Sequence, residues 1–336
     1  MGNHINKPNN KAQPSFGLRL RLMFGLVDFM TNVGALPTMA NITRWPMKKR
    51  QNMLLPQWLT HPPLPANVTI TNEVIPATQG EPLEVRVFTP ALVNPSRPAV
   101  LYIHGGGWIA GGMRNMDYVC ANVAADVGVR VVSVEYRLAP EFPFPAGLED
   151  CYAALSWLSQ HHSESGSSTS DVAVMGDSAG GNLAAAVCLL SKQRGGPRIA
   201  HQTLIYPCLD ANLKSESMQH HRGGLRRDQI ADMLAHYLQG NVSPDNPLVS
   251  PLKALDLTGL PPAFILTADA DPLRDEGKLY AEKLLAAGVS TRYLNVLGTP
   301  HGFISLPKLC KQTAGAMTEI VNELRAVKVT GAGTHE

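Results

Sequence analysis

The sequence has few cysteines and no closely spaced pair of them. Its 336 residues include five cysteines, an odd number, and none belongs to a Cys-x-x-Cys motif. Secreted disulfide frameworks and structural zinc sites depend on paired or clustered cysteines, so neither is predicted. A reducing compartment, the cytoplasm, is the expected location.

The chain also carries little net charge of either sign. Charged residues make up 17% of the chain, the formal net charge is +2, and the Lys and Arg residues are scattered. Nucleic-acid binding depends on clustered positive charge, so nucleic acid is not expected as a partner. Apolar residues make up 44% of the chain, which indicates a globular protein with a substantial core.

No apolar run is long enough to span a bilayer, so stable membrane insertion is not expected. Residues 18–30 (LRLRLMFGLVDFM) nevertheless place basic residues before an apolar run, and Thr-Met-Ala follows at 38–40. This arrangement imitates an export signal. Because Asp28 interrupts the run and a long polar lead precedes it, we favour an amphipathic helix that packs on the body or over a site. Export stays the alternative.

From about residue 68 onward, short β-branched runs alternate with segments of helical spacing. The predicted strands are 83–90, 99–104, 129–136, 172–176, 202–207, 263–268 and 292–296, and the predicted helices are 146–160, 182–192, 275–287 and 310–326. Strands that alternate with helices indicate an α/β fold, with a mostly parallel sheet covered by helices on both faces.

Two segments lack this alternation. Residues 1–60 are rich in methionine and are followed by a proline cluster, and residues 209–251 are rich in His, Met, Gly and Pro. We predict that both form helical pieces of a cap over the site. The catalytic domain then consists of residues 61–208 and 252–336, with 209–251 as a cap insertion.

A Gly-x-Ser-x-Gly motif centred on Ser178 lies between a predicted strand and a predicted helix. At such a strand-to-helix elbow the serine backbone is strained and its Oγ is exposed, and side chains at the flanking positions would collide with neighbouring backbone. The N-terminus of the helix adds a positive potential that favours developing negative charge. Ser178 is therefore the predicted nucleophile.

A His-Gly-Gly-Gly-Trp run begins at His104, directly after a predicted strand. Successive glycines leave backbone N–H groups uncovered and free to face a reacting oxygen. We predict an oxyanion hole formed by the N–H groups of Gly105, Gly106 and Ala179, in which loss of one donor would cost about 3 to 4 kcal/mol. His104 is expected to brace this loop, and Trp108 is the candidate for a substrate contact.

His301 lies in a loop after the last predicted strand. An imidazole, with an ordinary pKa of about 6.5, both accepts and returns a proton near neutral pH, which makes His301 the predicted base. The acid that orients it should follow the strand 263–268. Four carboxylates lie there, and their residue types alone do not separate them: Asp269, Asp271, Asp275 and Glu276.

In these motifs the sequence resembles the hormone-sensitive-lipase-like carboxylesterases of the α/β-hydrolase superfamily. The resemblance covers roughly residues 68–325 and includes Tyr-Arg-Leu-Ala-Pro-Glu at 136–141 and His-Gly-Phe at 301–303. In that family the acid is the aspartate directly before Pro-Leu, which corresponds to Asp271. The family also implies the α/β-hydrolase fold with an eight-stranded sheet, a helical cap and no cofactor.

The resemblance implies a serine carboxylesterase that hydrolyses a small-molecule ester, with a short to medium acyl chain, through an acyl-enzyme. An amidase, formamidase or lactonase stays an alternative, because the motifs specify acyl transfer and not the leaving group. A non-catalytic small-molecule receptor is disfavoured, since receptors of this fold lose the histidine that is present here. No metal is expected, and a homodimer is left open.

Overall fold

The computed structural model describes residues 39–53, 57–77, 81–164, 171–220 and 224–327, together with positions 17, 20, 22, 23, 25, 26, 30 and 31. The segment 18–30 therefore lies largely outside the described residues, and the choice between an amphipathic helix and an export signal stays a prediction. No helix in the described part of the chain is both long enough and apolar enough to cross a membrane.

Eight strands form one sheet. In chain order they are β1 (Val68–Ile75), β2 (Leu83–Pro90), β3 (Ala99–Ile103), β4 (Val131–Val134), β5 (Val172–Asp177), β6 (Ile199–Ile205), β7 (Ala263–Ala270) and β8 (Thr291–Pro300). Their spatial order is β1-β2-β4-β3-β5-β6-β7-β8. The β1–β2 and β2–β4 pairs are antiparallel and the other pairs are parallel, which confirms the expected sheet.

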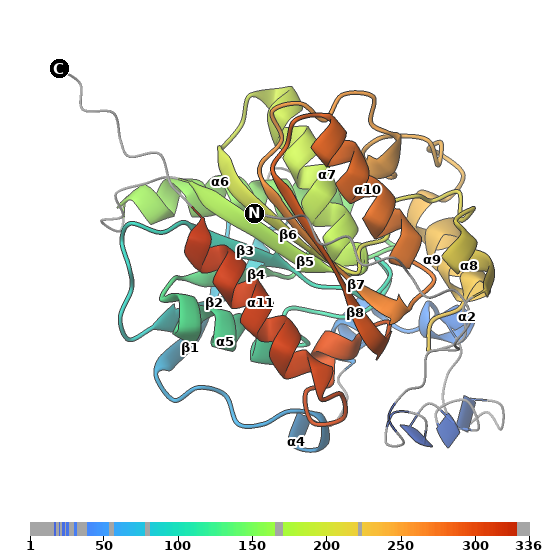
Figure 1. Ribbon diagram of the computed structural model, residues 1–336, viewed down its shortest axis with the longest axis horizontal. Coiled ribbons are helices and arrows are strands. Elements are labelled where there is room, and N and C mark those ends of the chain that lie inside the picture. The colour runs from blue at the N-terminus through green and yellow to red at the C-terminus, as the bar shows by residue number, and fades with distance from the viewer. Residues whose placement is uncertain are drawn as a thin grey trace.

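Helices cover both faces of the sheet (Figure 1). One face carries α5 (Asp117–Val127) and α11 (Gln312–Ala326), and the other carries α6 (Ala146–Glu164), α7 (Ala179–Arg194) and α10 (Arg274–Ala286). Alternate residues of β3 enter the two layers: Leu101 packs with α6 and α7, whereas Tyr102 packs with α5. Strands covered in this way are apolar along their whole length, which is why they were recognisable in the sequence.

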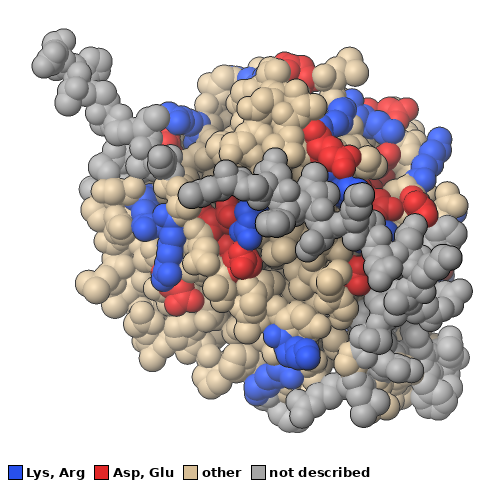
Figure 2. Space-filling view, viewed as in Figure 1, with Lys and Arg blue, Asp and Glu red and all other residues tan. Residues whose placement is uncertain are grey.

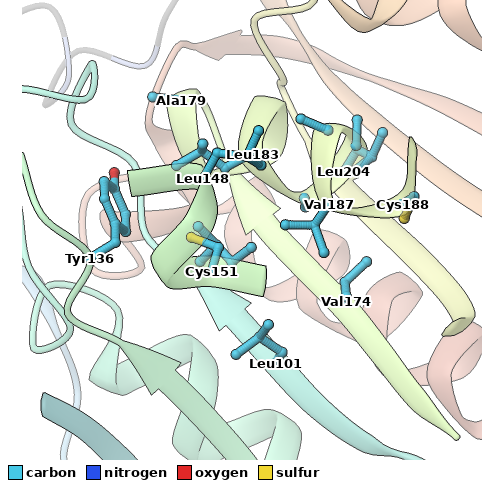
Figure 3. Packing of buried hydrophobic residues seen from close by; sticks show 14 of the residues in the cluster. Leu101, Tyr136, Leu148, Cys151, Val174, Ala179, Leu183, Val187, Cys188 and Leu204 are labelled. Atoms are coloured by element: carbon cyan, nitrogen blue, oxygen red, sulfur yellow. The ribbon is translucent and has the colours of Figure 1, made fainter. Parts of the chain in front are cut away.

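The larger core lies between the sheet and helices α6 and α7. Figure 3 shows Leu101 and Val174 of the sheet on the side where α7 places Leu183 and Val187. Each of these four side chains is fully buried. Burial of an aliphatic side chain of this size contributes about 1.5 to 3 kcal/mol, so this interface holds the strand and helix that flank residue 178 in one rigid unit.

Both segments that lack the alternation contain helices where they are described. The N-terminal segment contains α2 (Met39–Ile42), α3 (Met47–Gln51) and α4 (Gln57–Thr60), and the insertion contains α8 (Glu216–His220) and α9 (Arg227–Leu238) and leads into η1 (Pro251–Lys253). Figure 1 shows α2, α8 and α9 on one side of the molecule, near the end of β7. The division into a cap and a catalytic domain stays a prediction.

The cysteines are unpaired, and surface charges of the two signs are intermixed, as the sequence indicates. All five cysteines are free and buried, and burial raises the pKa of the thiols of Cys120 and Cys151. On the face shown in Figure 2, blue Lys and Arg side chains lie beside red Asp and Glu side chains. Arg292, for example, pairs with both Glu319 and Glu323.

Candidate active site

Ser178 lies at the turn between β5 and α7, with φ of 56° and ψ of −120°. A positive φ is a strained conformation for a residue with a side chain. The surrounding structure maintains it: the Ser178 N–H donates to the carbonyl of Ile205 at 2.9 Å. The turn directs the serine away from the strand, as the motif predicts.

The glycines of the motif are required by close backbone contacts. A Cβ atom on Gly176 would lie 2.3 Å from the carbonyl oxygen of Gly180, and one on Gly180 would lie 2.0 Å from the carbonyl oxygen of Ile103. Neither contact is tolerable, because the obstructing atoms belong to the backbone. The spacing of the motif therefore follows from how tightly α7 approaches β3 and β5.

Three side chains from the ends of three strands form a hydrogen-bonded chain. Ser178 follows β5, Asp271 follows β7 and His301 follows β8, so parallel strand ends bring them to one edge of the sheet. His301 Nε2 lies 2.9 Å from Ser178 Oγ, and His301 Nδ1 lies 2.7 Å from Asp271 Oδ2. With Nδ1–H donating to the carboxylate, Nε2 can accept the proton of the serine hydroxyl.

The other carboxylates after β7 have different partners. Asp269 accepts from the N–H of Gly298 at 3.2 Å. Asp275 accepts from the N–H of Ser217 at 2.8 Å, and Glu276 accepts from that of Leu209 at 2.9 Å. Of the four candidates, Asp271 is the one whose carboxylate contacts the imidazole of His301.

The glycine loop departs from the predicted set of oxyanion donors. The N–H of Gly105 donates to Asp177 Oδ1 at 2.9 Å, and the hydroxyl of Tyr102 donates to the same oxygen at 2.8 Å. Gly105 is thus not a free donor, which corrects the prediction. Within the described residues no acceptor is recorded for the N–H of Gly106, Gly107 or Ala179. Gly107, which sequence reasoning missed, is thus the second glycine of this run, with Gly106, whose N–H has no acceptor among the described residues.

His104 braces the loop, as expected. Its ring stacks on Tyr136 with centroids 4.3 Å apart, and Nδ1 lies 2.8 Å from the carbonyl oxygen of Gly105. Burial lowers the pKa of His104 to about 4, so the ring is neutral at physiological pH. A buried neutral ring held by a stacking contact and a hydrogen bond is suited to support and not to proton transfer.

Helix α9 packs directly on the glycine loop. Trp108 is 3% exposed and stacks on Tyr237 of α9, with ring centroids 4.8 Å apart and planes 7° apart. A Cβ atom on Gly107 would lie 2.1 Å from the sulfur of Met233, also on α9. Because Tyr237 covers the Trp108 ring, a substrate contact by Trp108 stays a prediction.

Two surface cavities lie elsewhere. One, of about 410 Å³, is lined by residues that include His61, Tyr118 and Lys308, and the other, of about 530 Å³, is lined by residues that include Met218 and Arg227. Neither lining includes a residue of the hydrogen-bonded chain. Among the described residues, no group of three or more His, Cys, Asp and Glu side chains is arranged to hold a metal ion.

Glu276 joins the start of α10 to the start of the insertion. Its Oε2 accepts from the N–H groups of Leu209 and Asp210, at 2.9 and 3.1 Å. Burial, together with the charges of Asp210 and Asp271, raises the pKa of Glu276 from its ordinary value of 4.5 to about 8. The carboxyl group is therefore mostly protonated at neutral pH.

This shift predicts a pH dependence of stability. Because the pKa of Glu276 is higher in the folded state, its stabilisation is complete below about pH 4.5 and is lost as the pH rises through about 8. Glu276→Gln keeps an acceptor and cannot ionise. Relative to this variant, the wild-type free energy of unfolding should fall between pH 5 and 8 by up to about 1.4 kcal/mol per pH unit. Urea denaturation across this range measures the difference, and parallel curves would contradict it.

Several known proteins are similar to this chain in both sequence and structure. Residues 100–305 match a family described by its alpha/beta hydrolase fold. Carboxylesterase NlhH of Mycobacterium tuberculosis is 41% identical over 73% of this chain and 79% of its own. Carboxylic ester hydrolase LipN of the same organism is 41% identical over 77% of this chain and 71% of its own. An alpha/beta hydrolase enzyme from the metagenome of Lake Arreo, Spain, superposes with a TM-score of 0.83 at 33% identity, over 94% of this chain and 99% of its own.

Proposed function

The chain belongs to the hormone-sensitive-lipase-like carboxylesterases of the α/β-hydrolase family, and from this we propose that it hydrolyses short- to medium-chain esters through Ser178, His301 and Asp271. That it is a carboxylic ester hydrolase follows from its relatives. The roles of the three residues rest on one observation. Their side chains form a continuous hydrogen-bonded chain, with links of 2.9 and 2.7 Å, in the order that nucleophilic catalysis requires.

The reaction proceeds in two acyl-transfer steps. Ser178 Oγ attacks the ester carbonyl carbon while His301 Nε2 takes the hydroxyl proton, and the carbonyl π electrons move onto oxygen. The resulting oxyanion accepts hydrogen bonds from the N–H groups of Gly106, Gly107 and Ala179. When the intermediate collapses, the alcohol leaves with the proton from His301. Water then repeats the sequence on the acyl-enzyme and releases the acid.

Asp271 contributes by orientation and charge. Its carboxylate is buried, and its second oxygen accepts from the N–H of Leu273 at 2.9 Å, which keeps the side chain in one rotamer. In that position it selects the imidazole tautomer with the proton on Nδ1. It also stabilises the imidazolium that forms when His301 takes the serine proton.

The preference for short to medium acyl chains is supported by the packing of α9 on the glycine loop. Met233 and Tyr237 lie against Gly107 and Trp108, close to the free N–H groups. We expect the acyl chain to extend toward this contact, so that a long chain would have to displace the helix. That displacement costs packing energy, which a short chain avoids.

A panel of matched substrates tests this proposal. Turnover of p-nitrophenyl esters from two to sixteen carbons should be highest for the short chains and should fall steeply toward the long ones. A p-nitroanilide and a lactone of matched acyl size serve as controls for the leaving group, and slower turnover of both is expected. Faster cleavage of the anilide or the lactone would favour the amidase or lactonase alternative. Binding of every substrate without turnover would favour a receptor.

The proposed compartment and partner rest on other features. All five cysteines are buried and none is paired in a disulfide, which is the pattern expected in a reducing compartment, and we place the enzyme in the cytoplasm. Its expected partner is a small-molecule ester. Export through an N-terminal signal is the alternative location.

A further inference from the structure

Arg50 is a fully buried arginine on the short N-terminal helix α3. Its Nη1 donates to the carbonyl oxygens of Ile109 and Ala139, both at 2.5 Å, and its Nε donates to that of Trp45 at 3.0 Å. Its Nη2 pairs with the carboxylate of Glu141. A guanidinium is costly to bury unless its donors are satisfied, and here each nitrogen has an acceptor.

The backbone of α3 and of the two residues after it also contacts residues 111–115. The carbonyl oxygen of Arg50 accepts from the N–H of Gly111 at 3.1 Å, and that of Met53 accepts from Asn115 Nδ2 at 2.9 Å. A Cβ atom on Gly112 would lie 2.4 Å from the carbonyl oxygen of Gln51. Residues 109–115 therefore rest on the end of α3.

The residues held by Arg50 are hydrogen-bonded to the backbone carbonyls of residues 106 and 108, in the loop that carries the free N–H groups. The carbonyl oxygen of Gly106 accepts from the N–H groups of Ile109 and Ala110, at 3.3 and 3.0 Å. A Cβ atom on Gly106 would lie 1.9 Å from the carbonyl oxygen of Ala110. The N–H of Ala139 donates to the carbonyl of Trp108 at 2.9 Å, so the second carbonyl held by Arg50 is also linked to this loop. A shift of Ile109 would therefore move Gly106 and Gly107.

We infer that Arg50 is a positioning residue for the oxyanion hole, which it aligns from the N-terminal segment through Ile109 and Gly111. The inference rests on the proposed function, because it takes the N–H groups of Gly106 and Gly107 as the oxyanion donors. These donors act mainly on the negative charge of the transition state. A misaligned loop should therefore lower kcat while KM changes little.

Two substitutions of graded severity test this role. Arg50→Lys keeps the charge but not the forked geometry, and Arg50→Met removes both. We expect kcat for a short p-nitrophenyl ester to fall about 10-fold in the lysine variant and about 100-fold in the methionine variant, because a displacement of about 1 Å costs that much. KM should stay within about 3-fold. The inhibition constant of an alkyl boronic acid, which forms a tetrahedral adduct on the serine, should rise in parallel with the loss of kcat.

Arg86→Met is the matched control. Arg86 pairs with Asp117 at 2.8 and 2.9 Å and links β2 to α5, and no bond from its side chain to residues 105–112 is recorded. This variant loses a partly buried ion pair as well, but its kcat should stay within about 2-fold of wild type.

Two results would overturn the inference while the wild type remains active. One is an unchanged kcat in Arg50→Met, whether or not KM rises. The other is a fall in kcat without a matching rise in the boronic acid inhibition constant. If the methionine variant does not fold, the lysine variant is judged by the same criteria. A wild type without ester turnover would instead overturn the proposed function.

Discussion

Replacing Ser178 with alanine is expected to lower kcat for ester hydrolysis by about 10⁶-fold. The variant retains the oxyanion donors and the base, but it has no oxygen with which to form an acyl-enzyme. The fold should not change, because the substitution removes one hydroxyl whose recorded side-chain partner is His301. Alanine also tolerates the positive φ of this turn no worse than serine.

Stopped-flow and mass-spectrometric measurements check this expectation together. Wild type should release p-nitrophenol in a burst and acquire the mass of a phosphonate label, and Ser178→Ala should do neither. Ser156→Ala is the control, because that serine donates to the carbonyl of Tyr152 within α6, away from the site. Residual turnover of the Ser178 variant above about 1% of wild type would contradict the assignment.

The sheet could be predicted where its strands are covered on both faces. β3 and β5 are buried at every position, so their apolar and β-branched runs are continuous. β1 was not predicted as a strand. It is an edge strand with only Ile75 fully buried, and its other residues alternate too weakly between apolar and polar.

The serine was recognisable because its constraint is local. The strained turn at Ser178 needs glycines two residues away on each side, and this leaves a pattern in the sequence. The acid leaves no such pattern, since any of four neighbouring carboxylates could have faced His301. The family resemblance indicated Asp271, and the 2.7 Å contact agrees with it.

The proposed set of oxyanion donors could not be chosen from the sequence, for a physical reason. Three successive glycines are equivalent in the sequence, and what distinguishes Gly105 is that Asp177, 72 residues away, accepts its N–H. Arg50 was missed for the same reason. Its acceptors Ile109 and Ala139 are backbone carbonyls 59 and 89 residues away, and nothing in their residue types predicts a buried arginine.

Substitution of Asp271 is expected to have the second large effect on turnover. Asp271→Asn is nearly isosteric, but its side-chain amide cannot both accept from His301 Nδ1–H and stabilise an imidazolium as a carboxylate does. With the amide NH₂ facing Nδ1, the ring would carry its proton on Nε2, where it cannot take the proton of Ser178. We expect kcat/KM to fall by about 10⁴-fold, with an unchanged fold.

Asp275→Asn, a substitution close to Asp271 in the sequence, provides the control. Its carboxylate accepts from the N–H of Ser217 and does not contact the imidazole, and an asparagine oxygen can still accept that bond. Its kcat/KM should therefore stay within about 5-fold of wild type. Equal losses in the two variants would mean that the negative charge of this region, and not the bond to His301, supports turnover. A large loss in Asp271→Asn alone would identify Asp271 as the residue that fixes the tautomer. Both substitutions remove one negative charge, but Asp275→Asn loses a pair with Arg274 and leaves the partner of His301 in place.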